Sequence, residues 1–315
     1  MKKINIVYLP YRRFNFSDLT FKLFTKCKNQ DFHITICGMN HQRGECNDLK
    51  IKANNLGLSA DTLIVTSAEM NYLDKLKTAS NMDFEFSFKL DEDIFINPNV
   101  WDYMFDNLHL LNDEKNLLIS TSLSNGIPSC DWFIKHHFSD KEKQEINSLF
   151  SKTRIPSIWG ADYSRLNNWK VTGYNANGWY EQVSYINHYY KGIHPVRVDL
   201  ASQDYINNWI INHKDLLYTK KELFLTEATQ PYFCNSIFGI KTSLWKTILE
   251  DKSLYRDNFD EVTLNLYRHQ SGKKMLFVEN GFGVHTIYNT LFSDINNPKE
   301  LIDKKEEQLF ESLNS

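Results

Sequence analysis

The acidic residues that follow an apolar run in the first third of the chain carry the strongest chemical signal. Residues 84–98 read F-E-F-S-F-K-L-D-E-D-I-F-I-N-P. If the backbone stays extended, Asp91 and Asp93 share one side of the strand and Glu92 points to the other side. Carboxylate oxygens on one side can converge on a hard divalent cation. The spacing therefore predicts a metal site, with a solvated or helix-capping acidic turn as the alternative.

The residues around this tripeptide favour a positioned site. Phenylalanine and leucine alternate with polar residues over 84–90, which is the pattern of a strand with one apolar face. The apolar run 94–96 follows the carboxylates, and Pro98 suits the first turn of a helix that reaches about residue 107. A surface turn is not normally flanked by so much apolar sequence.

Short apolar runs alternate with helical patterns through the first half of the chain. Besides 84–90, we expect strands at 4–9, 32–37, 62–66 and 117–120 and helices at 17–24, 47–56 and 69–80. Such alternation indicates an α/β fold with a mostly parallel central sheet flanked by helices. Ligands of these sheets bind at the carboxyl ends of the strands.

This rule places the loops at 10–13, 37–43, 66–69 and 91–93 on one rim. Arginine side chains are suited to binding phosphate groups. The aromatic ring of Tyr8 or Tyr11 is suited to stacking on a base. We expect donor contacts from these rim residues: Tyr8, Pro10, Arg12, Arg13, Arg43, Asp91 and Glu92. For each arginine the alternative is an ordinary exposed side chain. The sequence contains no G-x-G-x-x-G or Walker motif, which disfavours the common dinucleotide-binding and P-loop types of site.

The pattern changes between residues 126 and 230, which are rich in Trp, Tyr, His and Asn. Helices are expected there only at 140–152 and 202–213. Long irregular stretches are usually functional, so we interpret this region as an aromatic-rich acceptor-binding insertion. It separates a donor-binding half (1–125) from the rest of the catalytic domain (231–290). In that part we expect strands at 232–240 and 275–278 and helices at 241–249 and 258–269.

Residues 291–315 form a charged amphipathic helix in this reading. Ile302, Leu309, Phe310 and Leu313 lie on one side of it. The helix is expected to dock on the body of the protein or on a second subunit, which would give a homodimer.

Composition limits the classes of partner. The net charge of −3 argues against a generally basic, nucleic-acid-coating surface. The five cysteines lack C-x-x-C spacing, so neither a zinc site nor a disulfide framework is indicated, and the cytoplasm is the expected location. The apolar run near the N-terminus is too short and polar for a signal peptide, and no transmembrane segment is expected.

Three features follow one another along this α/β pattern. They are the carboxylate pair after the fourth strand, the acidic pair Asp260-Glu261 at a helix start, and His285 in a Gly-rich loop. By these features the chain resembles the GT-A fold of nucleotide-sugar-dependent glycosyltransferases, over about residues 1–125 and 231–290. The resemblance implies that Asp91, Asp93 and His285 bind Mn²⁺ or Mg²⁺ bridging the donor diphosphate. A nitrogen ligand among oxygens favours manganese.

The resemblance also implies catalytic roles for Asp260 and Glu261. A helix N-terminus keeps a carboxylate ionised, so Asp260, and second Glu261, would act as general base of an inverting reaction. Glu261 has the alternative role of capping-box partner. The implied function is a metal-dependent glycosyltransferase that moves a sugar from a nucleoside-diphosphate sugar, with UDP-sugar as first choice, to an acceptor hydroxyl. The default acceptor is a cell-surface glycan.

Other functions remain open at this point. A phage-type DNA glycosyltransferase would act on a hydroxymethylated base, and its phosphate contacts would come from Lys135, His136, His137, Lys152, Arg154, Arg165 and Lys170. A sugar-phosphate nucleotidyltransferase usually carries a Gly-rich loop after the first strand, whereas residues 10–13 contain no glycine. A non-catalytic carbohydrate-binding protein would need neither the acid pair nor a separate base.

Overall fold

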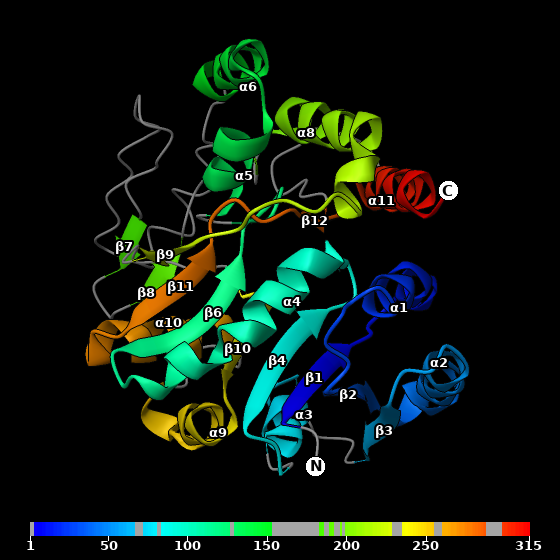
Figure 1. Cartoon of the computed structure of the whole chain (residues 1–315), viewed down its shortest axis with the longest axis vertical. Helices are drawn as coiled ribbons and strands as arrows, with labels where there is room; N and C mark the ends of the chain where they lie inside the picture. The colour runs from blue at the N-terminus through cyan, green and yellow to red at the C-terminus, as the bar shows by residue number, and fades with distance from the viewer. Residues whose placement is uncertain are drawn as a thin grey trace.

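Strands and helices alternate along the first hundred residues and assemble into one large sheet (Figure 1). The computed structural model describes residues 3–66, 72–80, 83–126, 129–152, 183–185, 189–191, 196, 199–228, 235–254, 260–287 and 298–315. Over these residues the sheet has eight strands in the order β3-β2-β1-β4-β10-β6-β11-β9. Most neighbouring strands in the first half are parallel and helices cover both faces, which confirms the predicted fold class.

The first four strands of the order form the parallel half of the sheet. They are β1 (Ile4–Leu9), β2 (Phe32–Met39), β3 (Ala60–Val65) and β4 (Phe86–Asp91). All six residues of β1 are buried, as expected for a parallel strand covered on both faces. The carboxyl ends of these strands therefore meet at one edge of the sheet.

The second half of the sheet is mixed. β10 (Ile237–Lys241) lies antiparallel between β4 and β6 (Asn116–Thr121). β11 (Lys274–Val278) is parallel to β6, and β9 (Leu225–Ala228) pairs with β11 in the antiparallel direction. The sequence pattern predicted β10 as a strand but contained no signal for its direction.

Alternate residues of the strands build two cores. On one face Ile6 and Tyr8 pack with α1 (Ser17–Phe24), α2 (Arg43–Asn55) and α4 (Pro98–Asp106). On the other face Val7 and Leu9 pack with α3 (Tyr72–Ala79), α9 (Thr242–Glu250) and α10 (Asp260–Ser271). The period of two along β1 therefore accounts for both layers.

A third core lies beyond the carboxyl ends of the strands. It joins α5 (Ser129–His137), α6 (Asp140–Lys152), α8 (Leu200–Asn212) and α11 (Pro298–Asn314), which Figure 1 shows together above the sheet. Trp209 is buried in it and stacks on Phe138 at 4.5 Å between ring centroids. The aromatic insertion thus contributes core residues as well as surface.

The C-terminal helix docks on the body of its own chain. Leu309, Phe310 and Leu313 are buried, and Phe310 stacks on Phe16 with ring centroids 4.3 Å apart. The apolar side predicted from the sequence is therefore covered within one molecule.

Short elements complete the described chain. Two small ribbons pair β5 (Ile94–Ile96) with β12 (Gly283–His285) and β7 (Val183–Tyr185) with β8 (Tyr189–Lys191). The 3-10 helices are η1 (Phe14–Phe16), η2 (Asn40–Gln42), η3 (Leu108–Asn112), η5 (Lys214–Leu217) and η6 (Lys252–Leu254). At Gly283 an added Cβ would lie 2.7 Å from Ile96 Cδ1 and from the carbonyl oxygen of Ser122, so only glycine allows this close approach.

Candidate active site

The turn after β4 separates the three acidic side chains. β4 ends at Asp91, Glu92 and Asp93 form a turn, and β5 begins at Ile94. The extended backbone that would place Asp91 and Asp93 on one side is therefore not present, because the alternation of side chains is lost where the chain turns. Each carboxylate meets a different partner.

Asp91 pairs with a lysine inside the sheet. The Nζ atom of Lys89 lies 2.9 Å from Oδ1 of Asp91 and 3.0 Å from Oδ2, and it donates a 2.9 Å hydrogen bond to the carbonyl oxygen of Asn235. Lys89 is buried, and a buried ammonium group needs a counter-charge. Asp91 supplies that charge, so its position is explained without a metal ion.

Glu92 accepts hydrogen bonds from the loop that follows β1. Its carboxylate receives the backbone N–H groups of Tyr11 at 2.7 Å, Arg12 at 3.0 Å and Arg13 at 3.0 Å. Burial raises the pKa of Glu92 above its ordinary value, although the three N–H groups oppose this by favouring the ionised form. The predicted donor residue Glu92 therefore holds the rim loop in place.

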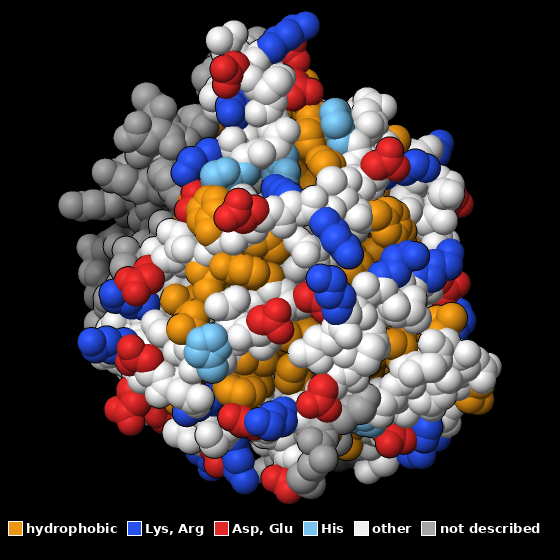
Figure 2. Space-filling model, in the orientation of Figure 1, with side chains coloured by type: hydrophobic (Ala, Val, Ile, Leu, Met, Phe, Trp, Pro, Cys, Tyr) orange, Lys and Arg blue, Asp and Glu red, His pale blue; other side chains and the backbone are white. Residues whose placement is uncertain are grey.

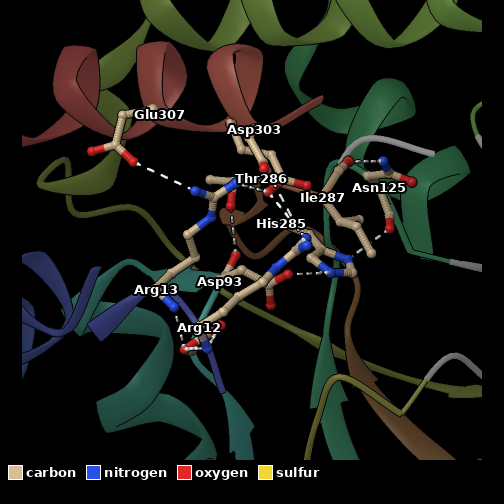
Figure 3. A network of polar contacts seen from close by, with 11 residues as sticks. Arg12, Arg13, Asp93, Asn125, His285, Thr286, Ile287, Asp303 and Glu307 are labelled. Carbon is tan, nitrogen blue, oxygen red and sulfur yellow. Dashed lines mark hydrogen bonds and ion pairs between the residues drawn. The ribbon is translucent and has the colours of Figure 1, made fainter. Parts of the chain in front are cut away.

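Asp93 is brought next to His285 by the small ribbon (Figure 3). His285 is the register partner of Ile94, and the N–H of Thr286 donates to the carbonyl oxygen of Asp93 at 3.0 Å. As a result Nε2 of His285 lies 3.5 Å from Oδ2 of Asp93. Two of the three predicted metal ligands are thus adjacent although they are far apart in the sequence.

The hydrogen bonds of His285 determine which ring nitrogen carries a proton. Nδ1 lies 2.9 Å from the carbonyl oxygen of Asn125, which can only accept, so Nδ1 must donate. In the neutral ring Nε2 then carries the lone pair, and Nε2 is the atom that faces Asp93. Burial alone would raise the pKa of Asp93, but the charge and hydrogen bond that His285 supplies when its Nε2 is protonated, together with a backbone hydrogen bond and the charge of Lys89, hold this pKa below its usual value.

The pair fits two ligands of one divalent cation. Donors that each lie about 2.1 to 2.2 Å from a metal are about 3 to 4 Å apart, which includes the observed 3.5 Å. The set of one imidazole and one carboxylate suits manganese. In the described part of the chain no cluster of three or more His, Cys, Asp or Glu residues has metal-binding geometry, so Asp91 does not complete a triad there.

The arginines of the rim loop are paired with α11 (Figure 3). One NH2 group of Arg13 lies 2.6 Å from Asp303 and 2.9 Å from Glu306, and Arg12 reaches Glu306 at 3.4 Å. Glu306 is buried. These contacts place both guanidinium groups on the rim, as predicted, but with carboxylates of the same chain as partners.

The other predicted donor residues differ in accessibility. Tyr8 and Pro10 are buried, and the Tyr8 ring packs on Phe21, so no face of Tyr8 is open to a base. Arg43 is exposed and donates to Asn40 Oδ1 at 3.2 Å. Tyr11, by contrast, is 73% exposed, while Glu92 and Gln42 hold its backbone N–H and carbonyl groups. Of the two aromatic candidates, Tyr11 alone offers a ring surface.

Several predictions concern residues outside the described set. α10 begins at Asp260, but the side chains of Asp260 and Glu261 are not among those described, and neither are those of Lys152, Arg154, Arg165 and Lys170. The loop at 66–69 is described only at its first residue. Lys135 and His136 are described, and both bind Oε1 of Glu279, at 2.7 and 2.8 Å.

Two contributors to the site were missed by sequence reasoning. Asn125 orients His285, and Lys89 neutralises Asp91. Lys89 was visible as a charged residue within an apolar strand, a position where a lysine needs a partner. The role of Asn125 depends on a contact between distant segments, so no local sequence pattern predicts it.

Comparison with known proteins finds solved structures of low similarity. No family model matches the sequence, and no curated protein matches it. A crystal structure of GalNAc-T7 with UDP, GalNAc and Mn²⁺ aligns with a TM-score of 0.46 and 10% identity, over 94% of this chain and 45% of that one. This chain therefore spans less than half the length of that protein.

Two further solved structures are covered almost completely. The 4-diphosphocytidyl-2C-methyl-D-erythritol synthase of Anaerococcus prevotii aligns with a TM-score of 0.42 and 9% identity, over 98% of this chain and 96% of that one. The inositol-1-phosphate CTP transferase of T. maritima has a TM-score of 0.40 and 12% identity, over 99% of this chain and 96% of that one.

In the described residues no helix is both long and apolar enough to cross a membrane.

Proposed function

We propose that this protein is a metal-dependent glycosyltransferase that moves a sugar from a nucleoside-diphosphate sugar to an acceptor hydroxyl. The observation that carries the proposal is the Asp93 and His285 pair at the carboxyl edge of the sheet, 3.5 Å apart between Oδ2 and Nε2. Ligands of parallel sheets bind at this edge. The proposed donor is a UDP-sugar, and the proposed acceptor is a cell-surface glycan.

Asp93 and His285 would hold the cation, with Mn²⁺ preferred over Mg²⁺. When bound, the cation would neutralise the negative charge that grows on the departing diphosphate. Asn125 would keep the Nε2 lone pair of His285 directed at the ion by fixing the opposite nitrogen as a donor. Asp91, paired with Lys89, would lie at the end of β4, just before the acidic turn and beside the donor.

Tyr11 is the proposed stacking platform for the base, because its ring is exposed on a loop that is fixed at both ends. Arg12 and Arg13 remain proposed phosphate contacts, although both guanidinium groups pair with carboxylates of α11. Asp260 remains the proposed general base of an inverting reaction, with Glu261 as second choice, because the N-terminus of α10 favours an ionised carboxylate.

The DNA acceptor gains no support from the described basic residues. Lys135 and His136 are both bound to Glu279, and His137 Nε2 donates to the carbonyl oxygen of Gly281 at 2.9 Å. On the face drawn in Figure 2, positive and negative side chains are interspersed over the described surface. A track that follows a phosphate backbone would instead group positive charges.

A thermal-shift series tests the proposal. We expect UDP-sugars to raise the Tm only when Mn²⁺ is present, because a ligand that binds the folded form alone stabilises it. The same stabilisation should disappear in His285→Gln, which keeps a polar side chain of similar reach. Stabilisation by CTP and release of pyrophosphate from CTP and a sugar phosphate would favour a nucleotidyltransferase instead, and a retained anomer in the product would exclude Asp260 as base of an inverting step.

A further inference from the structure

The two arginines of the rim loop differ in how closely α11 binds them. NH2 of Arg13 lies 2.6 Å from Asp303 and 2.9 Å from Glu306, and the Arg13 side chain is 16% exposed. Arg12 reaches the same two carboxylates only at 3.8 and 3.4 Å, beyond the usual range of a hydrogen bond, and its side chain is 45% exposed. Exposed ion pairs of this kind contribute little to stability. Arg13 is therefore firmly held, whereas Arg12 is loosely held.

The position of α11 does not depend on Arg12. Leu309, Phe310 and Leu313 of this helix are buried in the core beyond the sheet. Lys305, on the same helix, lies 2.6 Å from Asp204 of α8. With these contacts and those of Arg13 in place, α11 would stay docked if the Arg12 side chain turned away.

The backbone of Arg12 is fixed beside the proposed cation site. Its N–H donates to the carboxylate of Glu92 at 3.0 Å. The next residue in the chain is Asp93, whose Oδ2 lies 3.5 Å from Nε2 of His285. Figure 3 shows Arg12, Asp93, His285 and Asp303 within one network of polar contacts. A loosely held guanidinium group therefore extends from a fixed backbone next to the pair that would hold the cation.

We propose that Asp303 and Glu306 compete with the donor diphosphate for Arg12, so that α11 lowers the affinity of the site for its donor. This inference rests on the proposed function. In the free protein Arg12 pairs with the two carboxylates, and when the donor binds its guanidinium group turns to the diphosphate. Arg12 makes this exchange rather than Arg13, because its contacts with α11 are longer.

The charges on α11 explain why the exchange is finely balanced. Asp303, Glu306 and Glu307 lie on one side of the helix, at the spacing of neighbours on a helix surface. These three carboxylates face two guanidinium groups, since Glu307 also lies 3.9 Å from NH1 of Arg13. The negative excess retains Arg12 despite its long contacts. A diphosphate offers the guanidinium group a stronger, charge-assisted pairing.

Two other roles of these residues predict different behaviour. If Arg12 served only to hold α11, its replacement would lower the Tm and leave nucleotide affinity unchanged. If Asp303 only repelled phosphate through space, its neutralisation would tighten binding whether or not Arg12 was present. Competition alone makes the effect of Asp303 depend on Arg12.

Isothermal titration of the full chain with UDP in Mn²⁺ separates these roles in a double-mutant cycle. For Asp303→Asn we expect UDP to bind about two- to fivefold more tightly, as for release from a partly exposed ion pair. For Arg12→Gln we expect UDP to bind about tenfold more weakly, with little change in the Tm. Adding Asp303→Asn to Arg12→Gln should change the affinity by less than about 1.5-fold, because no arginine remains to be released.

Glu311→Gln is the matched control, because it removes the same charge from an exposed position of the same helix. It should leave the affinity for UDP unchanged. The Tm of each variant, measured without nucleotide, verifies that the chain is folded, and Asp303→Asn should lower it little because Glu306 still pairs with Arg13.

No gain in affinity for Asp303→Asn, or the same gain in the presence of Arg12→Gln, would overturn the competition while the proposed function stood. An equal gain for Glu311→Gln, or an unchanged affinity in Arg12→Gln, would also overturn it. If the unmodified protein did not bind UDP in Mn²⁺, the proposed function would be wrong, and this inference with it.

Discussion

The two ends of the candidate active site differ in how their polar groups are used. After β1, the N–H groups of residues 11–13 are bound by Glu92, and Arg13 is bound by Asp303 and Glu306. Beside β12, Asp93 and His285 are 3.5 Å apart, beyond the usual range of a hydrogen bond. The first end is held by many polar contacts, whereas the two polar groups of the second end are spaced as two ligands of one divalent cation would be.

Replacing Asp93 tests the second end and should give the largest effect. Asp93→Asn keeps the shape of the side chain but removes the charge that would bind the cation. We expect sugar transfer to fall by more than about 100-fold and the Mn²⁺-dependent rise in Tm to disappear. Activity is measured as release of nucleoside diphosphate with saturating donor.

The matched control is Asp48→Asn, on the exposed side of α2 and away from the rim. It should retain full activity. If Asp93→Asn stayed active and kept its affinity for manganese, the proposed metal site would be wrong. The contrast between the two ends of the site would then also be wrong.

Replacing Glu92 tests the first end. Glu92→Gln leaves one oxygen where two accept hydrogen bonds, and it turns an amide donor toward the N–H groups of Tyr11, Arg12 and Arg13. Hydrogen bonds to charged groups are strong, so we expect the free energy of unfolding to fall by about 3 kcal/mol in a urea titration.

Glu85→Gln is the control for Glu92, because its side chain is about half exposed and its salt bridge to Lys3 is 3.9 Å long. A change within about 0.5 kcal/mol is expected for it. If Glu92→Gln were equally mild, the loop after β1 would not be held by the polar contacts described above.

Replacing Glu306 asks how far α11 contributes to holding that loop. Glu306→Gln removes the buried charge that Arg12 and Arg13 share, but Asp303 still pairs with Arg13. We expect a smaller loss of about 2 kcal/mol in the free energy of unfolding. Glu311→Gln, farther along the same helix and exposed, should change it little, and equal effects of the two would show that the arginine contacts are unimportant.

The smallest effect concerns pH and the metal side. Burial, with the nearby charge of Lys221, lowers the pKa of His137 from 6.5 to about 3, and His137 holds the carbonyl oxygen of Gly281 on the segment that leads to His285. The unfolded chain binds this proton first, so His137 contributes its full stability above pH 6.5 and loses it as the pH falls toward 3.

Between about pH 7 and about pH 5 this loss should amount to about 1 to 2 kcal/mol. His137→Gln should therefore show a weaker dependence of the Tm on pH than the unmodified protein. His109→Gln, at an exposed position, is the control and should keep the original dependence. Identical slopes for all three proteins would rule out this role of His137.

Most of the fold was predictable because its signals are local. β1 occupies the predicted range Ile4–Leu9, and α6 occupies Asp140–Lys152, since apolar periodicity and capping residues are read from neighbouring positions. β5 and β12 were missed because strands of three residues are too short for a period. The antiparallel direction of β10 depends on a connection that no local pattern encodes.

The site was predictable only in part. The acidic tripeptide and His285 were identified by residue type. Because the chain turns at Glu92 and Asp93, the three carboxylates have different partners: Asp91 contacts Lys89, Glu92 contacts the loop after β1, and Asp93 contacts His285. Pairings of Arg13 with Asp303 and Glu306 are likewise long-range. The residue types indicated which side chains could take part in chemistry. Tertiary contacts determine which of these side chains are already paired with other residues of the chain.

The ribbon of β5 and β12 also sets when the site can exist. Its cross-strand bond joins Asp93 and Thr286, which are 193 positions apart in the chain. During synthesis the aspartate is translated long before the histidine, and domains generally fold as units. A nascent chain would therefore lack the adjacent Asp93 and His285 side chains until residue 285 had been translated.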